Sequence, residues 1–253
     1  MPTISVITAV YHPDPDYLRE ARNSVAAQEL PPGWDLEWLV QEDGRSDTAE
    51  QLLGAEPWIR HGRNRHGGQA ITRNLALASS RGELVRNLDQ DDVLAPGALV
   101  RDIAALDAHP DIGWATSRVL DLLPDGSTEG FNHDPQVGRV ERGDMVQQWR
   151  SHDYRLPVHP TTLCIRRPLA VALGGWMAVP GSEDTGLLIA ASVLTTGWFT
   201  GEIGLLYRKW PGQASASPDH TETTEWHARM SLINERAEQL ARLDTLVAQC
   251  DSG

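Results

Sequence analysis

Apolar residues in the first part of the chain form short blocks, and these blocks alternate with segments of helical spacing. Residues 4–10 are β-rich and short, which is typical of a strand buried in a parallel sheet. Asp14 followed by Pro15 predicts a helix start, because Asp is a favoured N-cap and Pro suits the first helical position. Further strands are predicted over residues 36–40 and 83–88. Helices are predicted over residues 47–53, 71–78 and 98–108.

The later part of the chain is less regular. Residues 112–122 are strand-like, and a polar, irregular stretch follows from about residue 126 to 140. A helix is predicted over residues 185–194, between short strands at 163–165 and 205–207. Asp219 with Glu222 forms a plausible capping box for a C-terminal helix. Apolar residues then recur there at helical spacing, namely Trp226, Met230, Ile233, Ala237 and Leu240. This stripe predicts a packing face, either within the chain or against a second copy.

The alternation of strands and helices predicts an α/β fold with a doubly wound, mostly parallel sheet. In such sheets ligands bind at the carboxyl ends of the strands. Two acidic segments, residues 42–44 and 89–92, each come directly after a predicted strand. Their shared position predicts a ligand site at that edge of the sheet.

The composition narrows the class of partner. The formal net charge is −13, which disfavours non-specific binding to nucleic acid, because phosphate neutralisation needs clustered Lys and Arg. The two cysteines, Cys164 and Cys250, form no disulfide framework and no CxxC metal motif. We find no signal peptide and no continuous apolar stretch of the roughly 18 residues that a membrane span needs. These features predict a cytoplasmic protein without integral membrane contact.

Residues Asp89-Gln90-Asp91-Asp92 are the strongest chemical signal in the sequence. Carboxylates this close repel one another unless a cation or buried hydrogen bonds hold them. Mg²⁺ or Mn²⁺ bridging phosphates is a common solution, since these ions prefer oxygen ligands. A solvated acidic turn that caps a helix is the alternative. The position at a strand end favours the metal.

Three weaker segments accompany this cluster. Glu42-Asp43-Gly44 places a carboxylate at a turn that directly follows a strand, where it can face a base or a ribose, or merely form the turn. Residues 64–68 and 72–74 combine basic side chains with paired glycines, which suit a phosphate but also an exposed connection. Glu183-Asp184 opens a helix, and serves either as a charge favoured by the helix dipole or as a general base.

Taken together, these segments resemble family 2 inverting glycosyltransferases of the GT-A fold. The family's first strand and its Asp-Asp-Gly element are similar to residues 4–12 and 42–47. Its Asn-x-Gly with Ala-Arg-Asn, its Asp-x-Asp-Asp and its late Gly-Gly-aromatic and Glu-Asp elements are similar to residues 64–74, 89–92, 175–176 and 183–184. The resemblance covers roughly residues 3–215 in the family's order.

The resemblance implies a GT-A, Rossmann-like, doubly wound sheet with a smaller acceptor-side subregion and a C-terminal helix. One continuous domain would comprise a nucleotide-sugar half over residues 1–95, an acceptor and catalytic-base half over 96–215, and a helical segment over 216–253. It implies a nucleoside-diphosphate sugar as donor, with UDP favoured, Mn²⁺ or Mg²⁺ as cofactor, and an acceptor that carries a hydroxyl group. A small molecule such as a secondary metabolite, or a glycan precursor, is the expected acceptor. A homodimer through the C-terminal helix is a further expectation.

The resemblance also implies residue roles. Donor binding falls to Ala9, Tyr11, Asp43, Arg65, Arg73 and Asp89, and metal binding to Asp91 with Asp92. Asp184, with Glu183 beside it, would deprotonate the acceptor hydroxyl. The acceptor side would include Trp149, His159, Trp176 and Trp210.

The chain departs from the family pattern at one functional position. Many members carry a late Arg-x-His whose His completes the metal sphere, whereas this chain has Arg208-Lys209-Trp210. Water, diphosphate oxygens, His159 or His220 are the candidates for the missing ligand. A nucleotidyltransferase is less favoured, because the loop after the first strand lacks a Gly-rich segment with Lys. A non-catalytic binding module is a further alternative, which the intact Asp184 disfavours.

Overall fold

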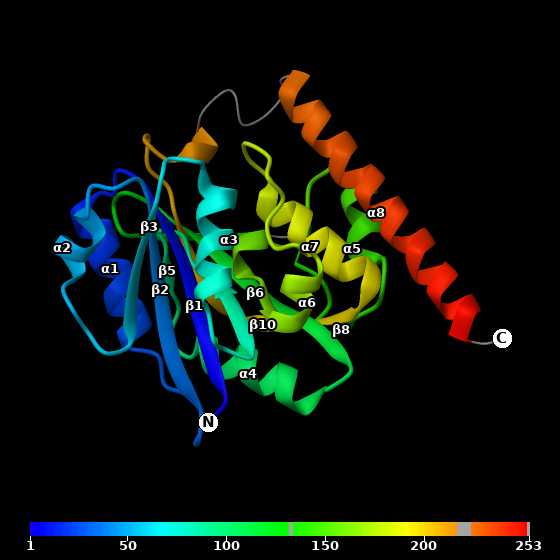
Figure 1. Cartoon of the computed structure of the whole chain (residues 1–253), viewed down its shortest axis with the longest axis horizontal. Helices are drawn as coiled ribbons and strands as arrows, with labels where there is room; N and C mark the ends of the chain where they lie inside the picture. Colours follow the sequence, from blue (N-terminus) through cyan, green and yellow to red (C-terminus); the bar gives the residue numbers. More distant parts are fainter. Residues whose placement is uncertain (132–133, 217–223, 252–253) are drawn as a thin grey trace.

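The computed structural model describes residues 1–131, 134–216 and 224–251. Within these residues the strands build one ten-stranded sheet, whose main path runs β3-β2-β1-β4-β9-β6-β10-β5 (Figure 1). Two short strands lie off this path, with β7 on β6 and β8 on β10. The strands are β1 (Thr3–Val10), β2 (Asp35–Asp43), β3 (Ile59–Asn64), β4 (Leu84–Asn87), β5 (Val93–Leu94), β6 (Ile112–Leu122), β7 (Thr128–Gly130), β8 (Gly138–Val140), β9 (Cys164–Arg166) and β10 (Thr196–Arg208).

Most neighbouring long strands run in parallel. β1 pairs in parallel with β2 and β4, β2 with β3, and β10 with β6. β9 is antiparallel to both β4 and β6, so it joins two parallel sets that point the same way. The predicted α/β class with a mostly parallel central sheet is confirmed.

Helices cover both faces of this sheet. They are α1 (Pro15–Ala26), α2 (Thr48–Leu53), α3 (Gln69–Ser79), α4 (Ala98–Ala108), α5 (Asp144–Ser151), α6 (Arg167–Ala172), α7 (Glu183–Leu194) and α8 (Thr224–Asp251), with 3-10 turns η1 (Pro160–Thr162) and η2 (Ala214–Ala216).

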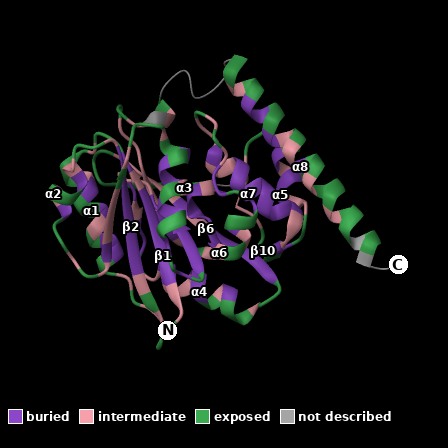
Figure 2. Cartoon of the chain, in the orientation of Figure 1, coloured by how far each residue is buried: buried purple, intermediate pink, exposed green. Residues whose placement is uncertain are grey.

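Alternate side chains of β1 reach two different cores. Ile4 and Val6 pack with residues of α1, α2 and α4, whereas Ile7 packs with residues of α3, α6 and α7. All of these strand positions are buried, as the purple strands of Figure 2 show. A strand covered on both faces reads as a continuous apolar block, which is why residues 4–10 were recognisable in the sequence. The predicted cap of α1 is confirmed too, since Asp14 accepts hydrogen bonds from the backbone N–H groups of Asp16 and Tyr17.

Several elements were not expected from the sequence. β3 has the sequence IRHGRN and lies at the edge of the sheet, where polar side chains are tolerated, so it lacks an apolar signature. The stretch expected to be irregular contains β7 and β8, two three-residue strands. α5 and α6 were also missed, at eight and six residues.

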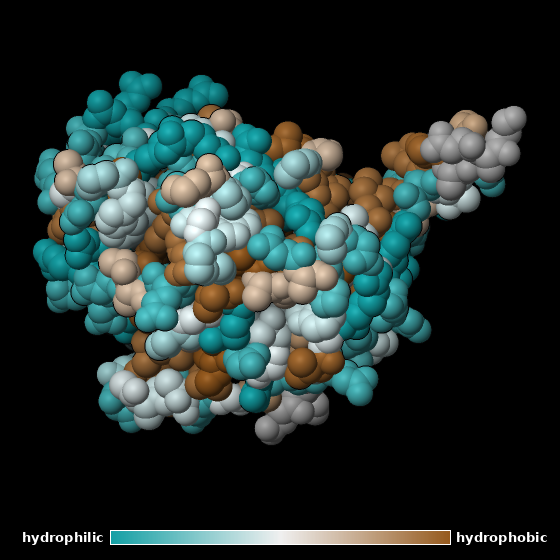
Figure 3. All heavy atoms as spheres, turned by 90° about the horizontal axis from the view of Figure 1, so that it is seen from below, coloured by the Kyte–Doolittle hydropathy of each residue, from teal (hydrophilic) through white to brown (hydrophobic). Residues whose placement is uncertain are grey.

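The C-terminal stripe packs within the chain. Met230, Ile233 and Ala237 are buried against residues of α5 and α7, and Trp226 and Leu240 contact the same cluster. The end of α8 projects from the body, with Leu243, Leu246 and Val247 exposed (Figure 3). The homodimer through this helix stays a prediction, and Asp219 and Glu222 of the predicted capping box lie outside the described residues. Along the part of the chain that the structure describes, no helix is both long and apolar enough to cross a membrane.

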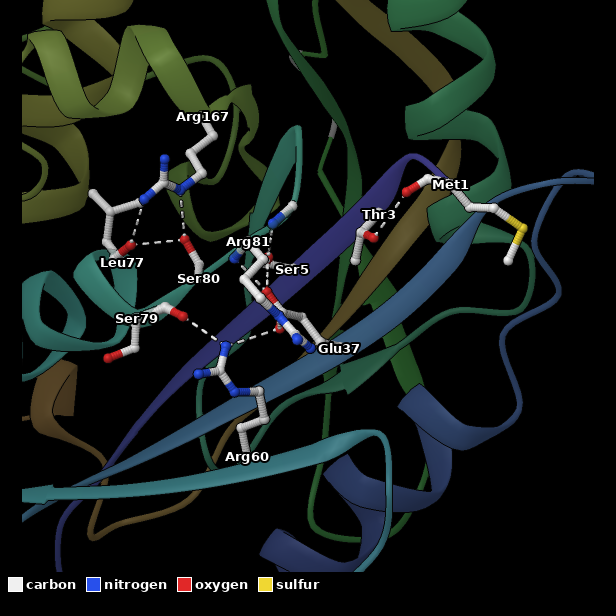
Figure 4. Close-up of polar contacts among 11 residues, drawn as sticks. Met1, Thr3, Ser5, Glu37, Arg60, Leu77, Ser79, Ser80, Arg81 and Arg167 are labelled. Atoms are coloured by element: carbon white, nitrogen blue, oxygen red, sulfur yellow. Dashed lines mark hydrogen bonds and ion pairs between the residues drawn. The ribbon is translucent and has the colours of Figure 1, made fainter.

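A buried carboxylate organises the amino edge of the sheet. Glu37 of β2 accepts hydrogen bonds from Oγ of Ser5 at 2.7 Å and from the backbone N–H of Arg81 at 2.6 Å. Its other oxygen accepts from Nη1 of Arg60 at 3.0 Å and Nε of Arg81 at 3.1 Å (Figure 4). Burial by itself raises the pKa of Glu37, but these donors outweigh it and hold the pKa below its ordinary value. This network ties β1, β2, β3 and the segment before β4 together.

Candidate active site

A cavity of about 1580 Å³ opens at the carboxyl edge of the sheet. The ends of β1 and β2, the loop after β4, the first turn of α7 and the loop after β10 all contribute to its wall. Because β1, β2 and β4 are parallel neighbours, their carboxyl ends bring distant segments of the sequence together. The predicted site residues that line it are Ala9, Tyr11, Asp43, Arg73, Asp89, Asp91, His159, Glu183, Asp184 and Trp210.

Four predicted site residues lie elsewhere. Trp149 is fully buried in the cluster between α5, α7 and α8, and Trp176 is buried beside α3 and α7, so neither forms the acceptor wall. Both indole rings bury a large apolar surface in the core, so they stabilise the fold and do not face the cavity. Arg65 is exposed outside the cavity. Asp92 is buried behind the cavity wall.

Hydrogen-bond donors surround the carboxylate of Asp43, which ends β2. Oδ1 accepts from the backbone N–H of Gly67 at 2.7 Å and from Nδ2 of Asn64 at 3.2 Å. Oδ2 accepts from the backbone N–H of Gly68 at 2.9 Å and lies 3.0 Å from Nδ1 of His66. A carboxylate offers about four acceptor positions, and here three hydrogen bonds and the approach of His66 surround this one. The predicted contact with a base requires one of these groups to move.

Tyr11 lies beside this carboxylate at the end of β1. Its ring stacks on His66 at a centroid distance of 4.7 Å and an interplanar angle of 25°. Its backbone N–H donates to Oε1 of Gln90 at 2.9 Å, and Nε2 of Gln90 donates to the Tyr11 carbonyl at 3.1 Å. Gln90 thus joins the loop after β1 to the acidic loop after β4. Sequence reasoning gave neither His66 nor Gln90 a role, and the only signal was their position inside two motifs.

Each carboxylate of the acidic loop has a different environment. Asp89 pairs with Arg73 and accepts from Oγ1 of Thr161 at 3.3 Å. Asp91 accepts from the indole N–H of Trp210 at 2.7 Å. Asp92 accepts from the backbone N–H of Arg208 at 2.8 Å. Trp210, predicted for the acceptor side, is therefore a neighbour of the predicted metal ligand.

Burial raises the pKa of Asp91, and the Asp89 carboxylate adds to this effect, while Trp210 offsets part of it. Burial also raises the pKa of Asp92 well above its usual range, with further contributions from Asp89 and Asp91. One oxygen of Asp92, Oδ2, is buried without a hydrogen-bond partner among the described residues. This loop therefore carries negative charge that the surrounding protein compensates only in part.

The residues fit a cation that arrives with a diphosphate better than a cation held by protein alone. Within the described residues, no three His, Cys, Asp or Glu side chains converge as a metal centre requires. Asp91 does face the cavity, and Mg²⁺ commonly binds through one or two carboxylates together with substrate phosphates. His220, one candidate for a further ligand, lies outside the described residues.

Arg73 joins the acidic loop to the first turn of α7. Its guanidinium group, 1% exposed, pairs with Asp89 through one terminal nitrogen and with Glu183 through the other. Burial by itself lowers the pKa of Arg73, but the carboxylates of Asp89, Glu183 and Asp184 outweigh this effect and raise the pKa above its ordinary value. The side chain therefore stays charged. The contact with a diphosphate predicted for Arg73 competes with two carboxylates that already hold it.

Asp184 follows Glu183 on the cavity wall at the start of α7. One of its oxygens, Oδ1, accepts from the backbone N–H of Thr185 at 2.7 Å. Burial raises the pKa of Asp184, Arg73 offsets part of this rise, and Asp89 adds to it. A carboxylate with a raised pKa, facing a cavity, has the properties of a general base.

His159 lines the cavity just before η1. Its ring lies 4.3 Å from the ring of Tyr207, and its Nδ1 is buried without a partner among the described residues. Burial lowers the pKa of His159 to about 4, so the imidazole is neutral at neutral pH. A neutral imidazole can accept a hydrogen bond from a hydroxyl group through one ring nitrogen or donate one to it through the other.

Comparisons with known sequences agree with this architecture. The sequence pattern described as Glycosyl transferase family 2 matches residues 5–168. A Myxococcus xanthus protein named O-antigen biosynthesis protein RfbC is 31% identical over 204 residues, which is 77% of this chain and 15% of that protein. A Bradyrhizobium elkanii protein named N-acetylglucosaminyltransferase is 25% identical over 126 residues, or 47% of this chain and 68% of that protein. The chain thus spans a small part of the first of these relatives.

The fold is similar to that of a solved structure. The crystal structure of S. aureus TarS 1-349 in complex with UDP-GlcNAc superimposes with a TM-score of 0.71 at 18% identity, over 97% of this chain and 72% of that one. The same protein in complex with UDP gives a TM-score of 0.69.

Proposed function

The chain belongs to glycosyl transferase family 2, and we propose that it is a metal-dependent, inverting enzyme that moves a sugar from a nucleoside-diphosphate donor to an acceptor hydroxyl. Uracil is the proposed base of the donor. Support comes from TarS, whose structures contain UDP and UDP-GlcNAc, and from the relative named N-acetylglucosaminyltransferase. UDP-GlcNAc is therefore the first donor to test.

One observation carries this proposal. Asp89 and Glu183 are distant in sequence, yet both pair with the buried Arg73 at the wall of a single cavity. The proposed donor side and the proposed base side are thereby held at a fixed spacing. Fixed geometry between reacting groups is a major source of rate enhancement, because positioning has been prepared by folding.

We assign the role of general base to Asp184. Its carboxylate accepts the proton of the acceptor hydroxyl while the hydroxyl oxygen forms a bond to the anomeric carbon of the sugar. The bond from that carbon to the diphosphate breaks at the same time, and the nucleoside diphosphate leaves with the bonding electrons. Because attack and departure occur on opposite faces, the anomeric configuration inverts. The raised pKa of Asp184 favours proton uptake near neutral pH.

Asp91 would be the protein ligand that holds Mn²⁺ or Mg²⁺ when the ion arrives with the donor diphosphate. Such an ion, when bound, offsets negative charge on the leaving diphosphate. The indole N–H of Trp210 donates to Oδ2 of Asp91, so the other oxygen, Oδ1, would be the one to contact the ion. Asp92 is buried behind the cavity wall, and burial raises its pKa, with further contributions from Asp89 and Asp91.

The proposed acceptor is a small molecule or a glycan precursor with a free hydroxyl group. His159 lines the same cavity as Asp184, and its neutral ring can hold such a hydroxyl. Exposed Phe131 lines the same cavity and offers apolar surface to a sugar ring.

A thermal-shift panel of UDP, GDP, dTDP and CDP, each with Mn²⁺ and with EDTA, tests this function. A matched ligand at 100 times its Kd stabilises the folded state by about 2.7 kcal/mol. We expect the largest shift for UDP with Mn²⁺, followed by release of UDP from UDP-GlcNAc when candidate acceptors are added. The proposal fails if no nucleoside diphosphate shifts the melting temperature, or if turnover is the same in EDTA.

A further inference from the structure

We propose that His66 holds the place of the nucleobase, and that the base of the donor displaces it and then binds between Tyr11 and Asp43. This inference rests on the proposed function and specifies how the donor is selected. His66 makes two contacts here, a ring stack on Tyr11 at 4.7 Å and 25° and an approach of Nδ1 to within 3.0 Å of Asp43 Oδ2.

A pyrimidine base with a ring N–H has the groups for both contacts. Its flat ring can stack on Tyr11, as bases do on exposed aromatic side chains. Its N–H can donate to a carboxylate, at the place where Nδ1 of His66 lies 3.0 Å from Oδ2 of Asp43. Tyr11 and Asp43 both line the cavity; the Tyr11 side chain is exposed, whereas that of Asp43 is buried in this arrangement.

The contacts of Asp43 explain why displacement is needed. Its three hydrogen bonds come from the amide of Asn64 and the backbone N–H groups of Gly67 and Gly68. His66, whose Nδ1 lies 3.0 Å from Oδ2, covers this carboxylate with a side chain that has 63% of its own surface exposed. Rotation of that one side chain frees both the Oδ2 position and the stacking face of Tyr11, while the backbone donors stay in place.

This arrangement selects the class of base. A carboxylate oxygen accepts hydrogen bonds and cannot donate, so it favours a ring nitrogen that carries a hydrogen. Uracil and thymine have such a ring N–H, whereas the corresponding ring nitrogen of cytosine is an acceptor. The imidazole is a single ring, so the place it holds suits a pyrimidine. We therefore expect UDP and dTDP to bind in preference to CDP.

Isothermal titration calorimetry of UDP in the presence of Mn²⁺ tests the displacement. If His66 occupies the base position, the wild type binds with an affinity reduced by the fraction of molecules in which the position is free. We expect H66A to bind UDP about threefold to tenfold more tightly than the wild type. H66F keeps a ring for Tyr11 and H66N keeps a donor for Asp43, so each should give part of the gain.

H109A is the matched control, since His109 also stacks on an aromatic ring, Trp198 at 4.3 Å, but lies outside the cavity. Its affinity for UDP should equal that of the wild type. NMR signals of the His66 ring provide a second measurement, because they should lose the ring-current shift from Tyr11 when UDP is added.

The outcomes separate the two proposals. Tighter binding by H66A supports the displacement. Unchanged or weaker binding by H66A, with a wild type that binds UDP, overturns the role of His66 and leaves the proposed function standing. Absence of UDP binding by the wild type contradicts both.

Discussion

Buried carboxylates lie at both edges of the central sheet, and their surroundings differ. At the amino edge, Glu37 accepts four hydrogen bonds from Ser5, Arg60 and Arg81, and its pKa is lowered. At the carboxyl edge, Asp91 and Asp92 have fewer donors than oxygens require, and their pKa values are raised. The same chemical group is thus well compensated in one place and poorly compensated in the other.

This difference separates stability from function within one sheet. At the amino edge, the hydrogen-bond donors around Glu37 stabilise its ionised form and thereby the folded state. The carboxylates at the carboxyl edge cost free energy when ionised, and such sites are where ligands and catalysis are commonly found. Under the proposed function, a cation that arrives with the donor diphosphate would compensate their charge.

The largest effect we expect concerns the base. D184N retains the shape of the side chain but cannot accept a proton, so turnover of UDP-GlcNAc should fall at least about 10³-fold, at the scale of general-base loss. The Kd of UDP should stay within about twofold, since Asp184 acts on the acceptor side. D125N, the same change at an exposed turn, is the control for turnover. Comparable turnover in D184N and D125N would remove Asp184 from the mechanism.

The second effect concerns the amino edge. E37Q replaces one acceptor oxygen by an amide that faces the donors of Arg60 and Arg81. We expect the free energy of unfolding in urea to fall by about 2 kcal/mol at pH 7, because a buried hydrogen bond to charge is lost and a donor is left unpaired. If E37Q left the free energy of unfolding unchanged, the carboxylate at the amino edge would be no better compensated than those at the carboxyl edge.

The pH dependence of this effect has a definite sign. The pKa of Glu37 is lower in the folded chain than the ordinary 4.5, so its stabilisation is complete above that value. It is lost as the pH falls from there through the folded pKa. The difference in unfolding free energy between wild type and E37Q should therefore shrink in acid, as urea titrations at several pH values can show.

The third effect has the opposite sign. The pKa of Asp92 is raised in the folded chain, so ionisation at pH 7 favours the unfolded state. D92N should therefore raise the free energy of unfolding by about 1 kcal/mol, since a buried charge with one oxygen left without a hydrogen bond is removed. Urea unfolding of D92N and wild type checks this: the stabilisation by D92N should be present at pH 7 and disappear at pH 3. A D92N chain that is less stable than the wild type at pH 7 would contradict the explanation.

The smallest effect concerns Trp210. W210F keeps a ring beside Tyr17 but loses the N–H that bonds Asp91. We expect the Kd of UDP with Mn²⁺ to rise about fivefold, which is the scale of one hydrogen bond, and the Kd in EDTA to stay the same. Y17F, which keeps the aromatic contact, is the control. An equal loss in EDTA would mean that Trp210 acts on the nucleotide and not through Asp91.

Much of the fold followed from the sequence because buried parallel strands leave continuous apolar blocks. β1 and the strand that precedes the acidic loop were recognisable in this way, and so was the Asp14 cap of α1. β3 was not, since an edge strand with the sequence IRHGRN can face solvent. β9 was predicted as a short strand over residues 163–165, but its antiparallel direction depends on pairing with distant strands, which a local pattern does not reveal.

Within the site, the sequence indicated which segments meet but not what each side chain contacts. Arg73 was assigned to the diphosphate, whereas its position between Asp89 and Glu183 depends on tertiary contacts. Trp149 and Trp176 were assigned to the acceptor, because composition alone does not separate a buried ring from a binding surface. The contact between His66 and Asp43 likewise depends on two loops that only the fold brings together.

The most direct test of this account compares UDP binding with and without a divalent cation in the wild type and in D91N. Calorimetry should give a Kd at least about tenfold lower in Mn²⁺ than in EDTA for the wild type, a difference of about 1.4 kcal/mol. D91N should bind UDP equally in both conditions, because the carboxylate that joins cation and protein is gone. A wild-type Kd that does not change with EDTA would contradict the claim that the carboxyl edge is completed by a cation and a diphosphate.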